Sequence, residues 1–216
     1  MNPNQIELEI RAAFRDWADL LVNPRFCRNS GLIAWTGYRG GGKLREPVTS
    51  AKLLTLVEEG QFSFQCSEDG SLFQILYQFG SDGKLEVVRL GFYQAIATQS
   101  KAQSEMIDSG YVPWLRIDYD EQAAAGVLHH GCHLHVHGFK NARIIVNGVP
   151  GPRQFVEFII AAFYPTYYEI HRLDGRGGQA DISILQAINT CSLPIAGEEG
   201  APLLLHVGVP ATAAGS

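Results

Sequence analysis

Two stretches of the chain have apolar residues at every third or fourth position, which is the period of an amphipathic helix. The first covers 4–22 and is followed by an Asn-Pro pair, which ends a helix because proline restricts the residue before it. The second covers 152–163 and opens with a proline, which the first helical turn accepts. A shorter helix is predicted over about 49–58, where Thr49 or Ser50 provides an N-terminal cap.

Apolar and polar residues alternate with a period of two in the middle of the chain, as they do in half-buried strands. Residues 61–94 contain three such runs separated by two Asp-Gly turns, an arrangement typical of an antiparallel meander. Further strands are predicted at 111–120, 131–137 and 141–147. The pattern therefore predicts an α+β fold, with a mainly antiparallel sheet of five to seven strands flanked by the N-terminal helix and the helix near 152–163.

Length and composition set the domain organisation. The 216 residues suit one large domain, and a hydrophobic content of 46% is enough for a packed core. We predict a single α+β domain over 1–175, which contains the histidine-rich strand. From about residue 175 the chain is rich in Gly, Ala, Ser and Pro, so 176–216 is predicted to be a C-terminal extension that packs on the domain and frays at its end.

Charge and cysteine content narrow the class of protein. The net charge of −5 argues against a general nucleic-acid binder, although it leaves room for a local basic patch. None of the four cysteines forms a C-x-x-C pair. The charged residues among the first 21 positions argue against a signal peptide, and no apolar run reaches the ~18–20 residues that a membrane span needs. We therefore expect a soluble cytoplasmic protein with no membrane contact.

Candidate chemistry concentrates in the stretch 131–138 (GCHLHVHG), which holds three of the seven histidines. On a strand, His133, His135 and His137 face one side, and Cys132 faces the core on the other. Imidazole titrates near neutral pH, both donates and accepts hydrogen bonds, and binds metals. Three imidazoles on one face are difficult to explain by packing alone, so we predict that these histidines are catalytic.

The spacing of the histidines leaves the type of chemistry open. Residues two apart on a strand are separated by ~6.6–6.8 Å, so one metal ion could be held by His133 and His135 with a ligand from elsewhere, but hardly by all three histidines. The alternative is chemistry without a metal, in which one histidine is the nucleophile or general base and its neighbours position a phosphate. A divalent metal is thus a candidate cofactor. A polar sheet face with no catalytic role is the third reading.

A second charged run, 116–120 (RIDYD), lies one strand earlier in the sequence. If the two strands pair antiparallel, its carboxylates lie beside the imidazoles, where they fix the tautomer and raise the basicity of the rings. We therefore predict a catalytic role for Asp118. The candidate substrate-binding residues are Arg116, Asp120 and Arg143. The guanidinium group of each arginine can hold a phosphate or carboxylate with two hydrogen bonds, and Asp120 lies on the same strand as Arg116.

The run 133–137 (HLHVH) resembles the histidine-triad pattern, in which histidine and apolar residues alternate. This resemblance covers about five residues. Histidine-triad proteins are nucleotide hydrolases and transferases in which the middle histidine attacks the α-phosphate. The resemblance implies that His135 is the nucleophile and that the chemistry is that of a phosphodiesterase or a nucleotidyl hydrolase or transferase.

A longer resemblance spans about 60–165 and links the chain to an uncharacterised bacterial family of domains of unknown function. The matching stretches are 68–79 (EDGSLFQILYQF), 115–120 (LRIDYD), 133–135 (HLH) and 151–159 (GPRQFVEFI). The Arg-x-Asp-Tyr-Asp element followed by a histidine cluster is also similar to the TumE type of toxin–antitoxin component. The family pattern has His-x-His, without the third histidine.

These resemblances imply a small cytoplasmic bacterial protein of a toxin–antitoxin or phage-defence type system, with a protein partner encoded in the same operon. Our first hypothesis is an enzyme that acts on a phosphate-containing substrate, either a nucleotide or RNA. The second is a non-catalytic interaction module whose histidine face contacts the partner. The sequence does not decide between them.

Overall fold

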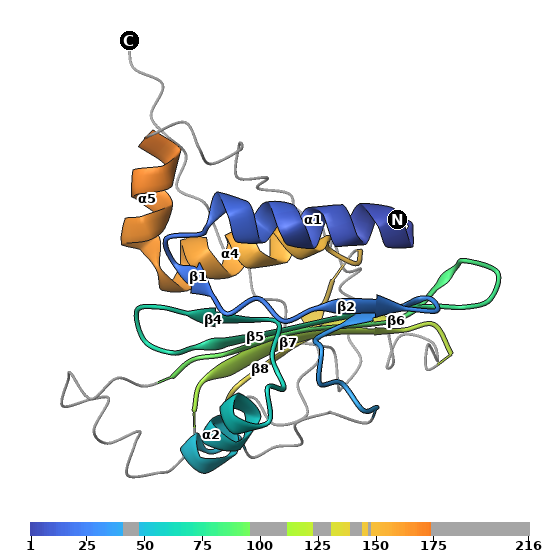
Figure 1. The fold of residues 1–216 in the computed structure, drawn as a ribbon, viewed down its shortest axis with the longest axis horizontal. Coiled ribbons are helices and arrows are strands. Elements are labelled where there is room, and N and C mark those ends of the chain that lie inside the picture. Colours follow the sequence, from blue (N-terminus) through green and yellow to red (C-terminus); the bar gives the residue numbers. More distant parts are fainter. Residues whose placement is uncertain (41–47, 96–111, 123–130, 139–143, 147, 174–216) are drawn as a thin grey trace, which may run out of the picture.

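The computed structural model describes residues 1–40, 48–95, 112–122, 131–138, 144–146 and 148–173 (Figure 1). Within these ranges the chain forms an antiparallel sheet with helices on both faces. The helices are α1 (Pro3–Asp16), α2 (Ser50–Glu58), α4 (Pro152–Phe163) and α5 (Pro165–Leu173). The strands are β1 (Leu21–Val22), β2 (Cys27–Asn29), β3 (Leu32–Ala34), β4 (Phe64–Cys66), β5 (Leu72–Phe79), β6 (Leu85–Tyr93), β7 (Trp114–Asp120), β8 (Cys132–Val136) and β9 (Ile144–Ile145).

The sheet follows the order β1-β4-β5-β6-β7-β8-β9, and β2 and β3 branch from it because β3 also pairs with β5. Every pairing is antiparallel. The α+β prediction is confirmed. The described residues hold nine strands, more than the expected five to seven, because β1 and β2 are too short to show a periodic pattern in the sequence.

The meander β4–β5–β6 is confirmed, and its turns have the expected chemistry. Gly70 and Gly83 have φ angles of 81° and 78°, a left-handed conformation that suits glycine. The aspartate before each glycine accepts a backbone N–H two residues further on: Asp69 from Ser71 and Asp82 from Lys84. These turns set the register of β5 against its neighbours.

One face of the sheet packs on α1 and α4, which lie side by side across it (Figure 1). Ile6 and Ile10 of α1 and Phe155 and Ile159 of α4 are fully buried against the core-facing residues of the strands. The helix α4 begins as the sequence predicts, with Pro152 in its first turn. The helix α1 also has a proline in its first turn, and Asn2 caps it by accepting the backbone N–H of Gln5 through its side chain.

Two smaller apolar clusters lie on the opposite face of the sheet. Under α2, the strands contribute Leu72, Tyr93 and Trp114 to the first cluster. The second joins Trp35, which follows β3, to Leu76 of β5. This face is therefore only partly apolar, and the strand positions between the two clusters carry polar side chains.

Two helix boundaries differ from the prediction. The first helix ends at Asp16 rather than at residue 22, because the chain turns at Trp17 and Leu21 pairs with Cys66 in the sheet. Leu21 is buried there in strand β1 and Leu20 in the turn before it, and neither lies on a helix face. The second difference concerns Pro165, which from the sequence is expected to break or kink the helix over 152–163. A further helix, α5, begins there with this proline in its first turn.

The predicted strand over 111–120 begins at Trp114, and the described part of the predicted strand over 141–147 is β9. The predicted C-terminal extension, 176–216, lies outside the described residues.

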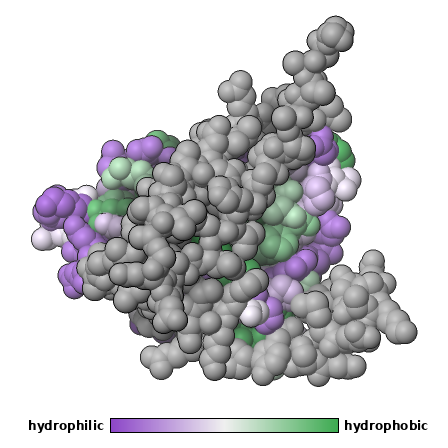
Figure 2. Space-filling view, turned by 180° about the vertical axis from the view of Figure 1, so that it is seen from behind, coloured by the Kyte–Doolittle hydropathy of each residue, from purple (hydrophilic) through white to green (hydrophobic). Residues whose placement is uncertain are grey.

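Hydrophilic and hydrophobic residues both reach the surface of the described part of the chain (Figure 2). Seen from behind, hydrophobic colour shows in small areas between hydrophilic residues and the undescribed ones (Figure 2). The exposed large hydrophobic side chains Leu8, Leu54 and Ile170 come from three different helices. Among the described helices, none combines the length and the apolar content that crossing a bilayer requires.

Candidate functional site

The polar positions of the open sheet face form two adjacent rows that cross the strands. Residues paired in antiparallel strands place their side chains on the same face, so the register shows which side chains meet. The first row is Gln74, Gly91, Arg116 and His135, and the second is Leu76, Arg89, Asp118 and His133. We call these two rows the polar rows.

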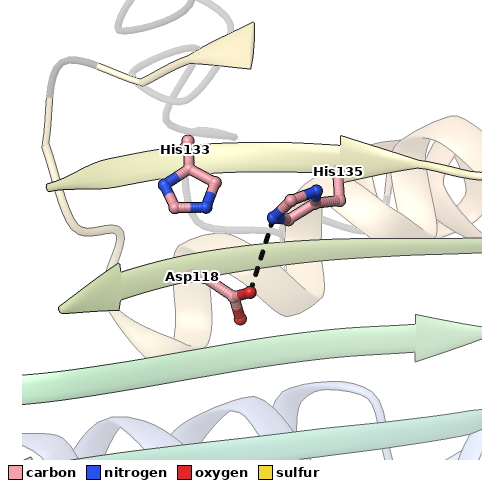
Figure 3. Close-up of side chains that lie close together, drawn as sticks. All are labelled: Asp118, His133 and His135. Atoms are coloured by element: carbon pink, nitrogen blue, oxygen red, sulfur yellow. Dashed lines mark ion pairs between the residues drawn. The ribbon is translucent and has the colours of Figure 1, made fainter. Parts of the chain in front are cut away.

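Three side chains of the polar rows converge between β7 and β8 (Figure 3). Asp118, His133 and His135 each present one nitrogen or oxygen atom, and these atoms all lie within 4.8 Å of one another. The two imidazole rings meet edge to face, with centroids 4.7 Å apart. His135 Nε2 is 3.6 Å from Asp118 Oδ2. The predicted pairing of a carboxylate strand with the histidine strand is therefore observed, and we call these three residues the Asp-His-His cluster.

The cluster is sheltered from solvent. Asp118 is 8% exposed and His133 is 6% exposed, and His135 is partly buried. Charged and polar side chains at such depth need partners, because burial without them is costly. Their enclosure also means that electrostatic interactions within the cluster are stronger than they would be in water.

Arg116 forms an ion pair with Asp118. Its Nε donates to both carboxylate oxygens, at 3.0 and 2.9 Å, and its Nη2 lies 2.9 Å from Oδ2. The guanidinium also stacks near Trp114, with Cζ 5.7 Å from the ring centroid. Both contacts hold the planar group in one orientation, which is the condition for recognising a planar or tetrahedral anion.

Arg89, Tyr93 and Gln74 belong to the site although the motifs did not indicate them. Arg89 is the cross-strand neighbour of Asp118. The Tyr93 hydroxyl donates to Gln74 Oε1 at 3.3 Å, and the Gln74 amide donates to the backbone oxygen of Gln61 at 2.7 Å. This chain of hydrogen bonds fixes the Tyr93 hydroxyl over the first polar row.

Burial raises the pKa of the Tyr93 hydroxyl to about 12, and the nearby charge of Arg116 opposes this shift only in part. The hydroxyl therefore stays protonated at neutral pH and serves as a hydrogen-bond donor. Gly91 lies beneath this ring: a Cβ added there would be 3.0 Å from a Tyr93 ring carbon. Because Gly91 has no side chain, the Tyr93 ring can lie against the backbone of the first polar row.

The polar rows have more positive than negative charge. Arg89 and Arg116 face a single carboxylate, that of Asp118. Within the described part of the chain, no carboxylate forms an ion pair with Arg89. With the imidazoles uncharged, the two rows hold two guanidinium groups and one carboxylate, and Asp120 occupies the next position of β7 on the same face, opposite Val87.

The other predicted site residues lie at different distances from the cluster. His137 is at the end of β8, where its ring approaches Trp114 edge-on at 6.4 Å, and it is not one of the three converging side chains. Asp120 is at the end of β7, where its carboxylate accepts the backbone N–H of Gln122. Arg143 lies outside the described residues.

Cys132 faces the core, as the alternation predicts. It is buried, and burial raises the pKa of its thiol to about 12. Its Sγ lies 3.4 Å from the backbone oxygen of Gly148. A protonated, enclosed thiol on the far side of the strand has a structural role and is no nucleophile for the histidine face.

The arrangement provides the components for chemistry on an anion. Asp118, His133 and His135 are groups that can exchange protons or hold a metal, and Arg89 and Arg116 are cations beside them. The register brings all five together from three strands, β6, β7 and β8. One signal in the sequence could have identified Arg89: it is the single charged residue in the run 87–93 (VVRLGFY).

A family comparison matches residues 23–196 to a family described as "Uncharacterized conserved protein (DUF2290)". The match covers most of the 216 residues, so the chain belongs to this family. The resemblance to an uncharacterised family is thereby confirmed, and the match extends beyond the 60–165 region at both ends. Comparisons with curated proteins and with solved structures found no match.

Proposed function

We propose that this member of the DUF2290 family hydrolyses or transfers a phosphoester group of a phosphate-containing substrate, a nucleotide or RNA, at the Asp-His-His cluster. The observation that carries the proposal is the charge of the polar rows. Two arginines border a sheltered group of proton-exchanging side chains that holds only one carboxylate. Two guanidinium groups beside such a cluster favour an anionic substrate.

Arg116 and Arg89 have different parts in this proposal. Asp118 fixes the plane of the Arg116 guanidinium, so its donors keep a constant direction toward a phosphate. Arg89 supplies the charge that Asp118 does not neutralise. Tyr93, held protonated above the row, provides a neutral donor for a further phosphate oxygen.

The Asp-His-His cluster generates the nucleophile. Without a metal, His135 either attacks phosphorus and expels the ester oxygen, after which water or an acceptor hydroxyl displaces the histidine, or it takes the proton of an attacking hydroxyl that expels the same oxygen. Asp118, 3.6 Å away, stabilises the imidazolium that forms. If Asp118, His133 and His135 held a metal ion, the ion would supply a bound water with a lowered pKa as the nucleophile. In both cases the negative charge that develops on phosphate oxygens lies near Arg89 and Arg116.

We further propose a toxin–antitoxin or phage-defence setting in the bacterial cytoplasm, with a partner protein encoded in the same operon. This proposal is supported by the Arg-x-Asp-Tyr-Asp element and the histidine pair, which resemble the TumE type of component. The histidine-triad resemblance supports the assignment of His135 as the central catalytic group.

The test is turnover of bis-p-nitrophenyl phosphate, a panel of nucleotides and a short RNA by the purified chain. We expect His135→Ala to abolish turnover and Arg89→Ala to lower kcat/KM by about 10- to 100-fold, the value of a lost charge-assisted hydrogen bond. Arg11→Ala is the matched control, because it removes an exposed arginine from α1, on the other face of the sheet.

Two results would oppose the proposal. If the folded wild-type chain turns over none of these substrates and binds no nucleotide, the enzyme assignment fails. If His135→Ala then separates the chain from a partner purified with it, the non-catalytic interaction module is the better description.

A further inference from the structure

We infer that Asp118, His133 and His135 form the binding site of one divalent transition-metal ion, with Zn²⁺ the best match. The inference rests on the proposed function for the role of the metal, which is to supply a bound water as nucleophile. The binding itself follows from the geometry of the three side chains and can be measured without any substrate.

The geometry permits a single ion. Three atoms no more than 4.8 Å apart fit within a circle of radius about 2.8 Å (4.8 Å divided by √3), and zinc bonds to nitrogen or carboxylate oxygen are ~2.0–2.2 Å long. Small rotations of the side chains close this difference. The backbone need not move, because Asp118 and His133 are direct cross-strand partners and His135 is the next residue on the same face.

The surroundings of the three ligands also fit a metal site. Arg116 donates to both oxygens of Asp118 and so fixes the carboxylate, a role that outer-shell groups have in metal centres. A carboxylate has about four lone pairs, so these hydrogen bonds leave acceptor capacity for a metal. Since the cluster is sheltered, water competes little for the ligand atoms.

The donor atoms select the type of ion. Two imidazole nitrogens and one carboxylate oxygen suit Zn²⁺ and related transition metals, whereas Mg²⁺ and Ca²⁺ prefer oxygen ligands. Three protein ligands leave a position for water, which is the pattern of catalytic rather than structural zinc. With Arg89 and Arg116 close by, the bound ion adds to an already positive site, so an anion that binds beside it should strengthen metal binding, and the reverse.

The test is metal binding by the chelator-treated, full-length protein. Zn²⁺ is titrated against a chromophoric competitor, and Co²⁺ absorption reports a tetrahedral site with nitrogen ligands. We expect one equivalent of Zn²⁺, no binding of Mg²⁺ in the same range, and tighter Zn²⁺ binding when AMP is present. His133→Ala, His135→Ala and Asp118→Asn should each weaken Zn²⁺ binding by more than the ~10- to 100-fold that loss of an outer-shell partner costs.

Matched controls separate ligand loss from general effects of substitution. His137 directly follows β8, and Asp120 lies on the same strand as Asp118, but neither residue belongs to the converging group. Both control variants, His137→Ala and Asp120→Asn, should keep one equivalent of Zn²⁺ at nearly wild-type affinity. Circular dichroism and urea unfolding identify any variant that fails to fold, and for Asp118 the Glu variant then replaces the Asn variant.

The outcomes distinguish the metal site from the proposed function. Folded wild-type protein that binds no Zn²⁺ or Co²⁺, or His135→Ala that binds Zn²⁺ as tightly as the wild type, overturns the metal site. If turnover then persists in EDTA, the proposed function stands without a metal. If one Zn²⁺ binds through the three residues but no phosphate substrate is turned over or bound, the metal site stands and the proposed function fails.

Discussion

At the scale of single residues, Gly91 is important because of what a side chain there would displace. An added Cβ would lie 3.0–3.3 Å from the Tyr93 ring, which is 1% exposed and cannot swing into solvent. We expect Gly91→Ala to lower the free energy of unfolding by about 1–3 kcal/mol, as overpacking does, and to reduce turnover by displacing the Tyr93 hydroxyl. Urea denaturation and kinetics measure the two effects.

Gly148→Ala is the control for this prediction. An added Cβ at position 148 meets no atom of the described residues within 4 Å, and its backbone does not require glycine. We expect its free energy of unfolding to stay within about 0.5 kcal/mol of the wild type. If Gly91→Ala is as mild as Gly148→Ala, then Tyr93 is not held over the polar rows in the way described.

Alternation along β7 and β8 was sufficient to predict which candidate residues share a face. It placed Arg116, Asp118 and the histidines together, and it placed Cys132 in the core. It could not place Arg89 opposite Asp118, because period two gives the face of a residue but not its partner on the next strand. Partners depend on register, which the turns and bulges of the meander determine.

At the scale of elements, α5 is held to the segment that directly follows α1 by a small set of contacts around His171. The His171 ring stacks on Trp17 at 4.3 Å, and its Nε2 lies 2.8 Å from Asp19 Oδ2. We expect His171→Ala to lower the free energy of unfolding by about 2 kcal/mol, because it removes a buried ring and a hydrogen bond to a carboxylate. Urea denaturation followed by tryptophan fluorescence measures the loss.

Ile170→Ala is the neighbouring control in the same helix, since Ile170 is largely exposed. It should change the free energy of unfolding by less than about 0.5 kcal/mol. Equal losses for the two variants would mean that the contacts of His171 with Trp17 and Asp19 do not stabilise the protein.

The elements that the sequence predicted well are long and periodic, and the ones it missed have short or mixed patterns. The pattern over 4–22 continues past the end of α1 because Leu20 and Leu21 are apolar for a different reason: Leu21 pairs in the sheet. α5 was missed because a proline was read as a stop, although it can equally begin a helix.

At the scale of the whole molecule, the sheet divides its two faces between stability and the candidate chemistry. The face under α1 and α4 contains most of the buried apolar residues, and the open face contains the polar rows. Substitutions of the charged and imidazole side chains in the polar rows should therefore impair the site more than the fold. Substitutions in the apolar core should impair the fold more than the site. Several weakly acidic side chains, the thiols of cysteines and the hydroxyl groups of tyrosines, are also buried in the interior.

Those interior groups predict how stability depends on alkaline pH. Burial raises the pKa of the Cys66 and Cys132 thiols, and of the Tyr93 hydroxyl, to about 12 in each case. Because the folded state holds these protons more tightly than the unfolded state, their contribution is complete below the ordinary pKa values of 9–10 and is lost as pH rises toward 12. We expect a loss of about 3 kcal/mol or more between pH 9 and pH 11, measured by urea denaturation with a reductant.

Cys132→Ala tests the cause of this loss. The variant should be less stable than the wild type at pH 7, because it leaves a small gap in the core, yet its stability should fall less steeply between pH 9 and pH 11. Replacement of Cys27, whose thiol is exposed, should leave the dependence of stability on pH unchanged. If all three proteins lose stability in parallel, ionisation of buried thiols is not the cause, and repulsion among the charges of an increasingly anionic chain would explain the alkaline loss better.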